Sequence, residues 1–141
     1  MKLATRWVLP VALLLGAAGL SGCVPKDKDA APTIGETMRK LNGGSSSMTR
    51  NLELDLKEDD PDWEAIQEST AEYAKLVAGL QKATPRKGDK ASWEKLTKDY
   101  ADKAQALDAA ARKKDRKTAS DVVARIKSSC AACHRAHRPM D

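Results

Sequence analysis

Apolar residues recur at alternating intervals of four and three after residue 33, and this repeat limits the possible folds more than any other feature of the chain. The first series consists of Ile34, Met38, Leu41, Ser45, Met48 and Leu52. Such a repeat places side chains along one face of an α-helix, as in the seam between helices of a bundle. No segment has the alternating pattern of a β-strand, and the chain contains no Phe. The sequence therefore predicts an all-α fold.

Start signals divide the repeat into four helical segments. The residues expected at the N-caps are Thr33, Asp60, Asp89 or Ser92, and Asp115. Glu36 completes a capping box with Thr33, and Pro61 takes the first helical position after Asp60. The inward positions expected in the last three segments are Trp63, Ile66, Thr70, Tyr73, Val77 and Leu80, then Trp93, Leu96, Tyr100, Ala104, Leu107 and Ala111, and finally Ala119, Val122, Val123, Ile126, Cys130 and Cys133. Four helices with short loops predict an antiparallel up-down-up-down four-helix bundle over residues 33–141.

The first helical segment has a weak point at Gly43, Gly44 and the serines at 45–47. Each Gly inside a helix costs roughly 1 kcal/mol relative to Ala. Two interpretations are open. Small residues permit the close approach of a flat group, or the helix is kinked or broken at this point.

The N-terminal segment has the features of an export signal. Lys2 and Arg6 precede an almost entirely apolar run over residues 7–20, which is shorter than a comfortable membrane span. Leu20, Ser21, Gly22 and Cys23 then resemble a bacterial lipobox. The resemblance implies that residues 1–22 are removed and that Cys23 becomes a lipidated N-terminus. An ordinary signal peptide and an uncleaved anchor are the alternatives.

Residues 23–32 are polar and flanked by prolines, so we interpret them as a lipidated tether. The nine residues that follow Cys23 reach at most about 30 Å when extended. The chain is therefore expected in the bacterial periplasm, anchored by lipid to a membrane.

Cys130 and Cys133 are separated by two alanines and followed directly by His134. This Cys-x-x-Cys-His pattern is the attachment signature of a c-type haem. The two thiols reach the two vinyl groups of one porphyrin, and the His supplies a proximal axial ligand to the iron. With Cys23 assigned to a lipid, the chain has no cysteine left for a structural disulfide. The sequence predicts one covalent haem c.

Two other uses of the motif compete with haem attachment. A thioredoxin-like pair needs a helix N-terminus to lower the thiol pKa, whereas Cys130 and Cys133 fall near the end of a helix. A zinc site would use both thiols with His134 or His137, but no other segment supplies a fourth ligand.

The motif at the C-terminus of a predicted four-helix bundle resembles the class II c-type cytochromes, the cytochrome c-prime family, over about residues 33–139. The resemblance implies that Arg138, four residues after His134, lies near a haem propionate or the proximal ligand. An exposed Arg at a helix end is the alternative. Family members that leave the iron open usually carry an Arg where this chain has Ile34. The resemblance also implies a possible homodimer.

The geometry of such a bundle selects a candidate for the distal ligand. The end of the last helix lies beside the start of the first, so Met38 faces His134 across the haem. Met48 lies about 15 Å further along the axis, Met140 is on the proximal side, and His137 shares a helix with His134. Met38 is therefore the expected distal axial ligand, although Met at a seam position is usually a core residue.

Two functions remain open at this point. A haem ligated by His134 and Met38 would be low-spin and suited to electron transfer. An iron without the Met38 ligand would instead bind small gases such as NO or CO. We do not expect an enzyme, because no acid–base pair is evident near the distal face.

The charge pattern bears on partners. The formal charge of +5 loses Lys2 and Arg6 when the signal is removed, and nothing in the chain is typical of nucleic-acid recognition. The basic residues expected at the haem end are Arg39, Lys40, Arg86, Lys87, Lys90, Arg135 and Arg138. This end would suit acidic redox partners or anionic headgroups, and ordinary solvated helix ends are the alternative.

Overall fold

The computed structural model describes residues 31–138. The chain divides into two units, Met1–Ala30 and Ala31–Asp141, of which only the second contains described residues. The predictions for the signal segment, for lipidation of Cys23 and for Met140 lie outside the described residues. Within residues 31–138, no helix combines the length and hydropathy that crossing a membrane requires.

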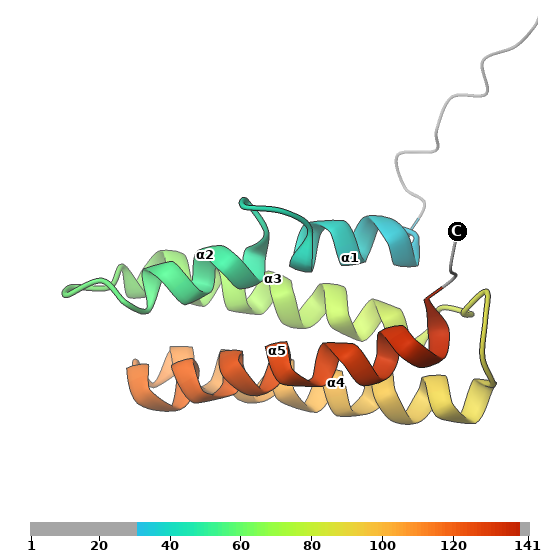
Figure 1. Ribbon diagram of the computed structural model, residues 1–141. Helices are drawn as coiled ribbons and strands as arrows, with labels where there is room; N and C mark the ends of the chain where they lie inside the picture. The colour runs from blue at the N-terminus through green and yellow to red at the C-terminus, as the bar shows by residue number, and fades with distance from the viewer. Residues whose placement is uncertain (1–30, 139–141) are drawn as a thin grey trace, which may run out of the picture. The chain divides into compact units, whose positions relative to one another are not determined.

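Residues 31–138 form helices and no strands, which confirms the all-α prediction. The five helices in this range are α1 (Ile34–Asn42), α2 (Met48–Asp55), α3 (Trp63–Gln81), α4 (Lys90–Arg112) and α5 (Arg116–His137). The helices α3, α4 and α5 run side by side, with their two connections at opposite ends of the group (Figure 1). The backbone of α2 approaches α3 and α5, and that of α1 approaches α2 and α3.

The first helical segment is broken, so residues 31–138 contain one more helix than the four segments expected. A Cβ on Gly43 would lie 2.5 Å from the carbonyl oxygen of Arg39, and Gly44 has a φ of +76°. Both positions therefore require Gly, and together they end α1. Ser45, expected on the seam, is exposed in the connection to α2. The break is the alternative that the structure confirms.

The structure confirms the predicted N-cap residue at three of the four predicted helix starts. Thr33 accepts a hydrogen bond from the Glu36 amide at 3.3 Å, and the Glu36 carboxylate accepts one from the Thr33 amide at 2.9 Å. Asp89 caps α4, which decides between Asp89 and Ser92. Asp115 caps α5. These signals are local, so a short stretch of sequence is enough to read them.

The cap predicted for α3 is wrong. Asp62, not Asp60, accepts a hydrogen bond from the Ala65 amide, at 3.1 Å, and the helix begins at Trp63. Pro61 is buried before the helix instead of occupying its first turn. Because the chain packs inward at Pro61, the exposed carboxylate of Asp62 is the one that reaches the first-turn amide.

The core consists mostly of the predicted inward residues, and most of those from α4 and α5 are Ala or Val. Its buried members are Leu41, Leu52, Leu56, Ile66, Tyr73, Val77, Ala101, Ala104, Leu107, Ala110, Ala111, Ala119, Val122, Val123 and Ile126. Further along the same faces, Leu96, Tyr100, Cys130 and Cys133 are only half-buried. The core therefore gives way to a cavity near the end of the molecule where α4 begins and α5 ends.

Candidate functional site

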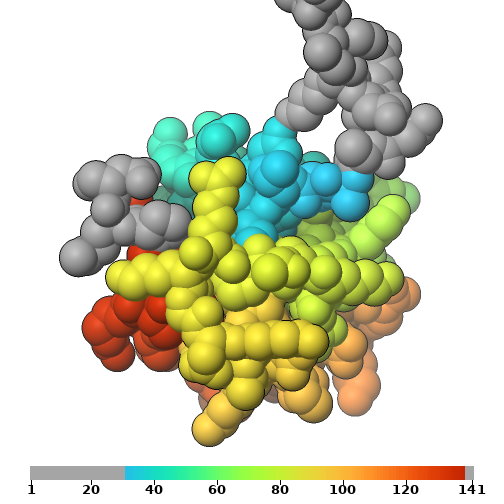
Figure 2. Space-filling model, turned by 90° about the vertical axis from the view of Figure 1, so that its right-hand side faces the viewer, coloured from blue at the N-terminus to red at the C-terminus, as the bar shows by residue number. Residues whose placement is uncertain are grey.

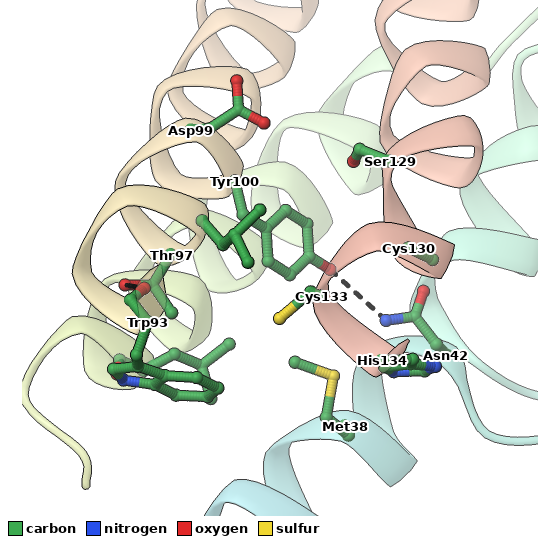
Figure 3. A pocket seen from close by; sticks show the side chains of 12 residues that line it. Met38, Asn42, Trp93, Thr97, Asp99, Tyr100, Ser129, Cys130, Cys133 and His134 are labelled. Atoms are coloured by element: carbon green, nitrogen blue, oxygen red, sulfur yellow. Dashed lines mark hydrogen bonds between the residues drawn. The ribbon is translucent and has the colours of Figure 1, made fainter. Parts of the chain in front are cut away.

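A small cavity that is open to solvent lies between α1 on one side and α4 and α5 on the other (Figure 3). Its lining residues are Met38, Asn42, Leu80, Trp93, Leu96, Thr97, Asp99, Tyr100, Ser129, Cys130, Cys133 and His134. The structure thus brings Met38 to the same cavity as Cys130, Cys133 and His134. These four residues were selected from the sequence as cofactor ligands.

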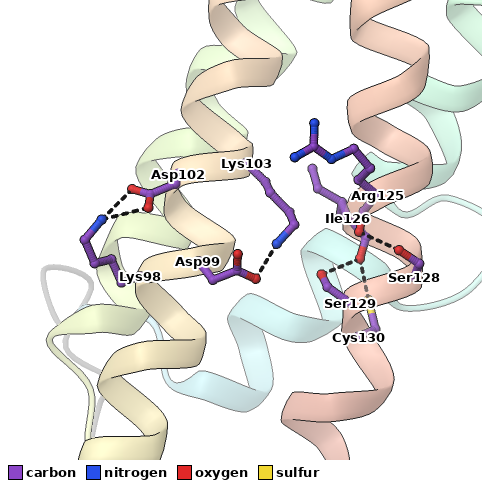
Figure 4. Close-up of polar contacts among 9 residues, drawn as sticks. All are labelled: Lys98, Asp99, Asp102, Lys103, Arg125, Ile126, Ser128, Ser129 and Cys130. Atoms are coloured by element: carbon purple, nitrogen blue, oxygen red, sulfur yellow. Dashed lines mark hydrogen bonds and ion pairs between the residues drawn. The ribbon is translucent and has the colours of Figure 1, made fainter.

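Helical spacing explains why the motif faces the cavity. Ile126, Cys130 and Cys133 follow one another at intervals of four and three on α5, so they share a face. Ile126 is buried in the core, and the two thiols continue the same face where the core ends. The Cys130 thiol donates to the Ile126 carbonyl at 3.4 Å, and the Ser129 hydroxyl donates to the same oxygen at 2.8 Å (Figure 4).

The electrostatics of the two thiols differ from those of a reactive redox pair. Burial raises the pKa of both Cys130 and Cys133 above its ordinary value. Both residues lie in the C-terminal part of α5, where the helix dipole also disfavours a thiolate. The environment is apolar instead, as a site that binds a flat hydrophobic group requires.

The buried His137 fastens the end of α5 to the connection between α3 and α4. Its Nδ1 lies 2.8 Å from the Lys87 carbonyl oxygen and its Nε2 lies 3.1 Å from the Ser92 hydroxyl. A carbonyl only accepts, so Nδ1 carries a proton that it donates to Lys87. The Trp93 ring stands edge-on to the imidazole, with 5.2 Å between the ring centroids.

These contacts bear on the zinc alternative, because both nitrogens of His137 are already engaged. Sequence reasoning missed this structural role of His137. No local sequence signal indicated it, because the partners lie far away along the chain. In the structure Gly88 has a φ of +85°, and a Cβ there would lie 2.4 Å from His137 Nδ1. A Gly is therefore required where the connection passes over the imidazole.

The residues that face the cavity fit a covalently bound haem. Its walls include the apolar side chains of Leu80, Trp93 and Leu96, which suit a flat macrocycle. Two thiols and an imidazole come from α5, and the thioether of Met38 comes from α1. The α1 backbone does not approach those of α4 and α5, so this space separates Met38 from the residues of α5.

Polar groups at the cavity are paired. The Asp99 carboxylate forms an ion pair with Lys103 one turn further along α4, beside the Lys98–Asp102 pair (Figure 4). The Tyr100 hydroxyl lies 2.6 Å from that of Tyr73. Burial raises the pKa of both phenols, which keeps both protonated and available as donors. The sequence pattern placed these tyrosines on the seam without indicating this hydrogen bond.

Two residues considered at the sequence level lie outside the cavity lining. Arg138 is the exposed C-cap of α5, where its amide donates to the His134 carbonyl at 3.0 Å. Its contact with a haem propionate stays a prediction. Ile34 is half-buried at the start of α1.

The beginning of α1, the connection from α3 to α4 and the end of α5 gather at one end of the molecule (Figure 2). The exposed basic residues of α1, of the connection from α3 into the start of α4 and of the end of α5 are Arg39, Lys40, Lys82, Arg86, Lys87, Lys90, Arg135 and Arg138. Lys40 pairs with Glu72 and Lys90 pairs with Glu94. The other six form no ion pair within residues 31–138, so they leave a positive surface beside the cavity.

No protein-family model, curated protein or solved structure matches this chain. The geometry of the cavity is therefore the basis on which a function is proposed.

Proposed function

We propose that this chain is a mono-haem c-type cytochrome of the cytochrome c-prime type that carries electrons through an iron held by His134 and Met38. The observation that supports this most strongly is that Met38 of α1 lines the same mainly apolar cavity as the two thiols and the imidazole of α5. The three α5 residues are neighbours in the sequence, so the independent finding is that a thioether from another helix lies at the same cavity.

The chain's own residues divide the work between attachment and ligation. Cys130 and Cys133 would hold the haem through thioether bonds, and His134 and Met38 would bind its iron. The haem supplies an iron that gains and loses one electron. His/Met ligation favours a low-spin iron with a raised potential, which suits an electron carrier. The apolar wall formed by Leu80, Trp93 and Leu96 would pack against the macrocycle on one side of the cavity.

In this proposal α1 and α2 together serve as the first member of an up-down-up-down four-helix bundle. The two short helices lie along α3, and the connections on either side of α4 are at opposite ends of the group. The break at Gly43 and Gly44 then separates α1, which carries Met38, from α2, which packs on α5.

A second function is favoured by one specific observation. The cavity is open to solvent, and Met38 is only half-buried on a short helix. If the thioether does not bind the iron, the same cavity would admit NO or CO at a five-coordinate haem.

The proposed place of action is the periplasmic face of a membrane, with Cys23 lipidated and residues 23–32 as the tether. Described structure begins at Ala31, directly before the capped start of α1. The residues that line the cavity and form the positive surface belong to α1, to the end of α3, to the connection from α3 to α4, to the first half of α4 and to the end of α5, which gather at that end. We place the encounter with acidic redox partners at this surface.

One measurement tests the proposal and separates the two functions. Absorption spectra of the purified holoprotein would be recorded oxidised and reduced, with and without CO. The electron carrier should be low-spin in both states and bind CO slowly. A protein without covalent haem would contradict both functions, and a high-spin iron that binds CO at once would favour the gas-binding one.

A further inference from the structure

Four polar side chains from four helices form a closed ring of hydrogen bonds beside the cavity. Thr49 of α2 lies 2.8 Å from the Asn42 amide oxygen and 3.0 Å from the Tyr73 hydroxyl. Tyr73 of α3 lies 2.6 Å from the Tyr100 hydroxyl, and Asn42 of α1 closes the ring to Tyr100 of α4 at 3.3 Å. Asn42 and Tyr100 line the cavity, whereas Thr49 and Tyr73 lie behind them.

The direction of every bond in the ring follows from the number of hydrogens. The amide oxygen of Asn42 only accepts, so Thr49 gives it its single hydroxyl hydrogen. Thr49 must then accept from Tyr73, and Tyr73 in turn must accept from Tyr100. Tyr100 accepts from the Asn42 amide nitrogen, which completes the circuit. Each member donates one hydrogen within the ring, so the loss of any hydroxyl leaves a buried neighbour unsatisfied.

The ring also spans a gap in the backbone packing. The α1 backbone approaches those of α2 and α3 but not that of α4. Among residues 31–138, the bond from Asn42 to Tyr100 is the hydrogen bond that joins α1 to α4. Asn42 is the last residue of α1 and lies one helical turn after Met38. The ring thus fixes α1 across the cavity at the turn next to Met38.

We propose that the Asn42–Thr49–Tyr73–Tyr100 ring positions Met38, by holding α1 at the separation from α4 at which the thioether reaches the iron. This inference rests on the proposed ligation by Met38. A nine-residue helix ending at Gly43 is too short to be stable by itself, so its position depends on such contacts. Thr49 is the most informative member, because it acts on the site only through the ring.

The test replaces Thr49 by Val, which keeps the shape of the side chain and removes its hydroxyl. Thr70→Val is the matched control. Thr70 is also a buried threonine, and it donates to Asp108 between α3 and α4 at 3.1 Å, outside the cavity. Thr49→Ser restores the hydroxyl and should restore the wild-type behaviour.

Three quantities would be measured on the haem-loaded proteins: the spin state, the rate of CO binding to the reduced iron, and the hydrogen exchange of the α1 amides. With Thr49→Val, both CO binding and α1 exchange should accelerate about tenfold, since about 1.4 kcal/mol of positioning is lost. A high-spin fraction should appear as well. Thr70→Val should leave all three near their wild-type values.

The inference is overturned if Thr49→Val keeps the wild-type spectrum, CO rate and α1 exchange while losing as much stability as Thr70→Val. Should Thr49→Val fail to fold, Tyr100→Phe breaks the same ring of hydrogen bonds while it keeps the aromatic side chain. This variant is judged by the same criteria. A wild-type iron that is already high-spin would contradict Met38 ligation instead. In that case the hydrogen exchange of the α1 amides alone decides whether the ring of hydrogen bonds holds α1 in place.

Discussion

The Nδ1 atom of His137 lies 2.8 Å from the carbonyl oxygen of Lys87, although the two residues are 50 positions apart. This bond joins the last turn of α5 to the connection between α3 and α4, directly beside the cavity. The end of the molecule that holds the cysteines is therefore closed by a specific polar contact as well as by apolar packing.

His137→Leu should lower the free energy of unfolding by about 1–3 kcal/mol, because the Lys87 carbonyl and the Ser92 hydroxyl both lose a partner. Denaturant unfolding of the haem-loaded protein measures this loss. Arg135→Ala, an exposed change on the same helical turn, should stay within about 0.5 kcal/mol of wild type. Equal effects of the two changes would contradict a specific role for the His137 contact.

Substitution of three glycines by Ala should give three different outcomes. Gly79→Ala, inside α3 with open space around it, should stabilise the protein by about 0.5–1 kcal/mol. Gly44→Ala should cost about 1–2 kcal/mol, since only its positive φ opposes a side chain. Gly88→Ala should cost more than Gly44→Ala, because its Cβ would also collide with His137. Thermal or denaturant unfolding gives the order, and equal losses at Gly44 and Gly88 would argue against the collision.

Met38→Ala should convert a low-spin iron to a high-spin one and raise the rate of CO binding to the reduced protein at least about tenfold. The absorption spectrum and CO kinetics measure both effects. Met48→Ala is the control, since Met48 packs against the core and does not line the cavity. An unchanged low-spin spectrum in Met38→Ala would exclude Met38 as the ligand.

Glu53 joins α2 to α5 through Lys127, at 2.8 Å, and also pairs with Lys57 at 3.1 Å. Hydrogen bonds to Lys127 and Lys57 lower the pKa of Glu53 to about 2, from an ordinary 4.5. Because the pKa is lower in the folded state, this stabilisation is present above pH 4.5 and is lost as the pH falls toward about 2.

Glu53→Gln should therefore flatten the dependence of stability on pH over that interval, and modestly so, because the pair is exposed to solvent. Urea unfolding midpoints at a series of pH values would show it. Glu68→Gln, an exposed change on α3, serves as the control. A Glu53→Gln profile parallel to that of the wild type would show that the ion pair does not form in solution.

The positive surface beside the cavity should set the rate of reaction with charged oxidants. Arg86→Glu combined with Lys87→Glu should slow oxidation of the reduced protein by anionic ferricyanide, and should make that rate less sensitive to ionic strength. The cationic oxidant tris(phenanthroline)cobalt(III) should respond in the opposite direction. Lys113→Glu combined with Lys114→Glu, at the far end of α4, should change neither rate. If none of these substitutions changes the rates, electron exchange takes place at another part of the surface.

The sequence was most informative where the signal is local. The capping box at Thr33 and the spacing of Cys130, Cys133 and His134 each lie within a few residues of one another, so one helix is enough to interpret them. The start of α3 was misplaced because it depends on the burial of Pro61, which is set by the rest of the fold.

The contacts that were missed all join distant parts of the chain. The bond from Asn42 to Tyr100 spans 58 positions, and the seam pattern that selected Tyr100 does not reveal what its hydroxyl faces. Met38 was selected by its height in a bundle and does line the cavity. The helix that carries it ends at Asn42, which is the break that the sequence had left open as one of two interpretations. A periodic pattern thus predicts which face of a helix turns inward. The hydrogen-bond partners that this face meets on other helices can be identified only from the structure.

The separation of α1 from α4 and α5 has a consequence for the order of assembly. The backbone contacts of α1 are with α2 and α3, whereas the half-buried cysteines belong to α5, which packs on α4. The α3–α4–α5 group can therefore form with both thiols still reachable from the side that α1 later covers. If a haem is attached to Cys130 and Cys133 as proposed, the thioether bonds could therefore form first and the docking of α1 could follow.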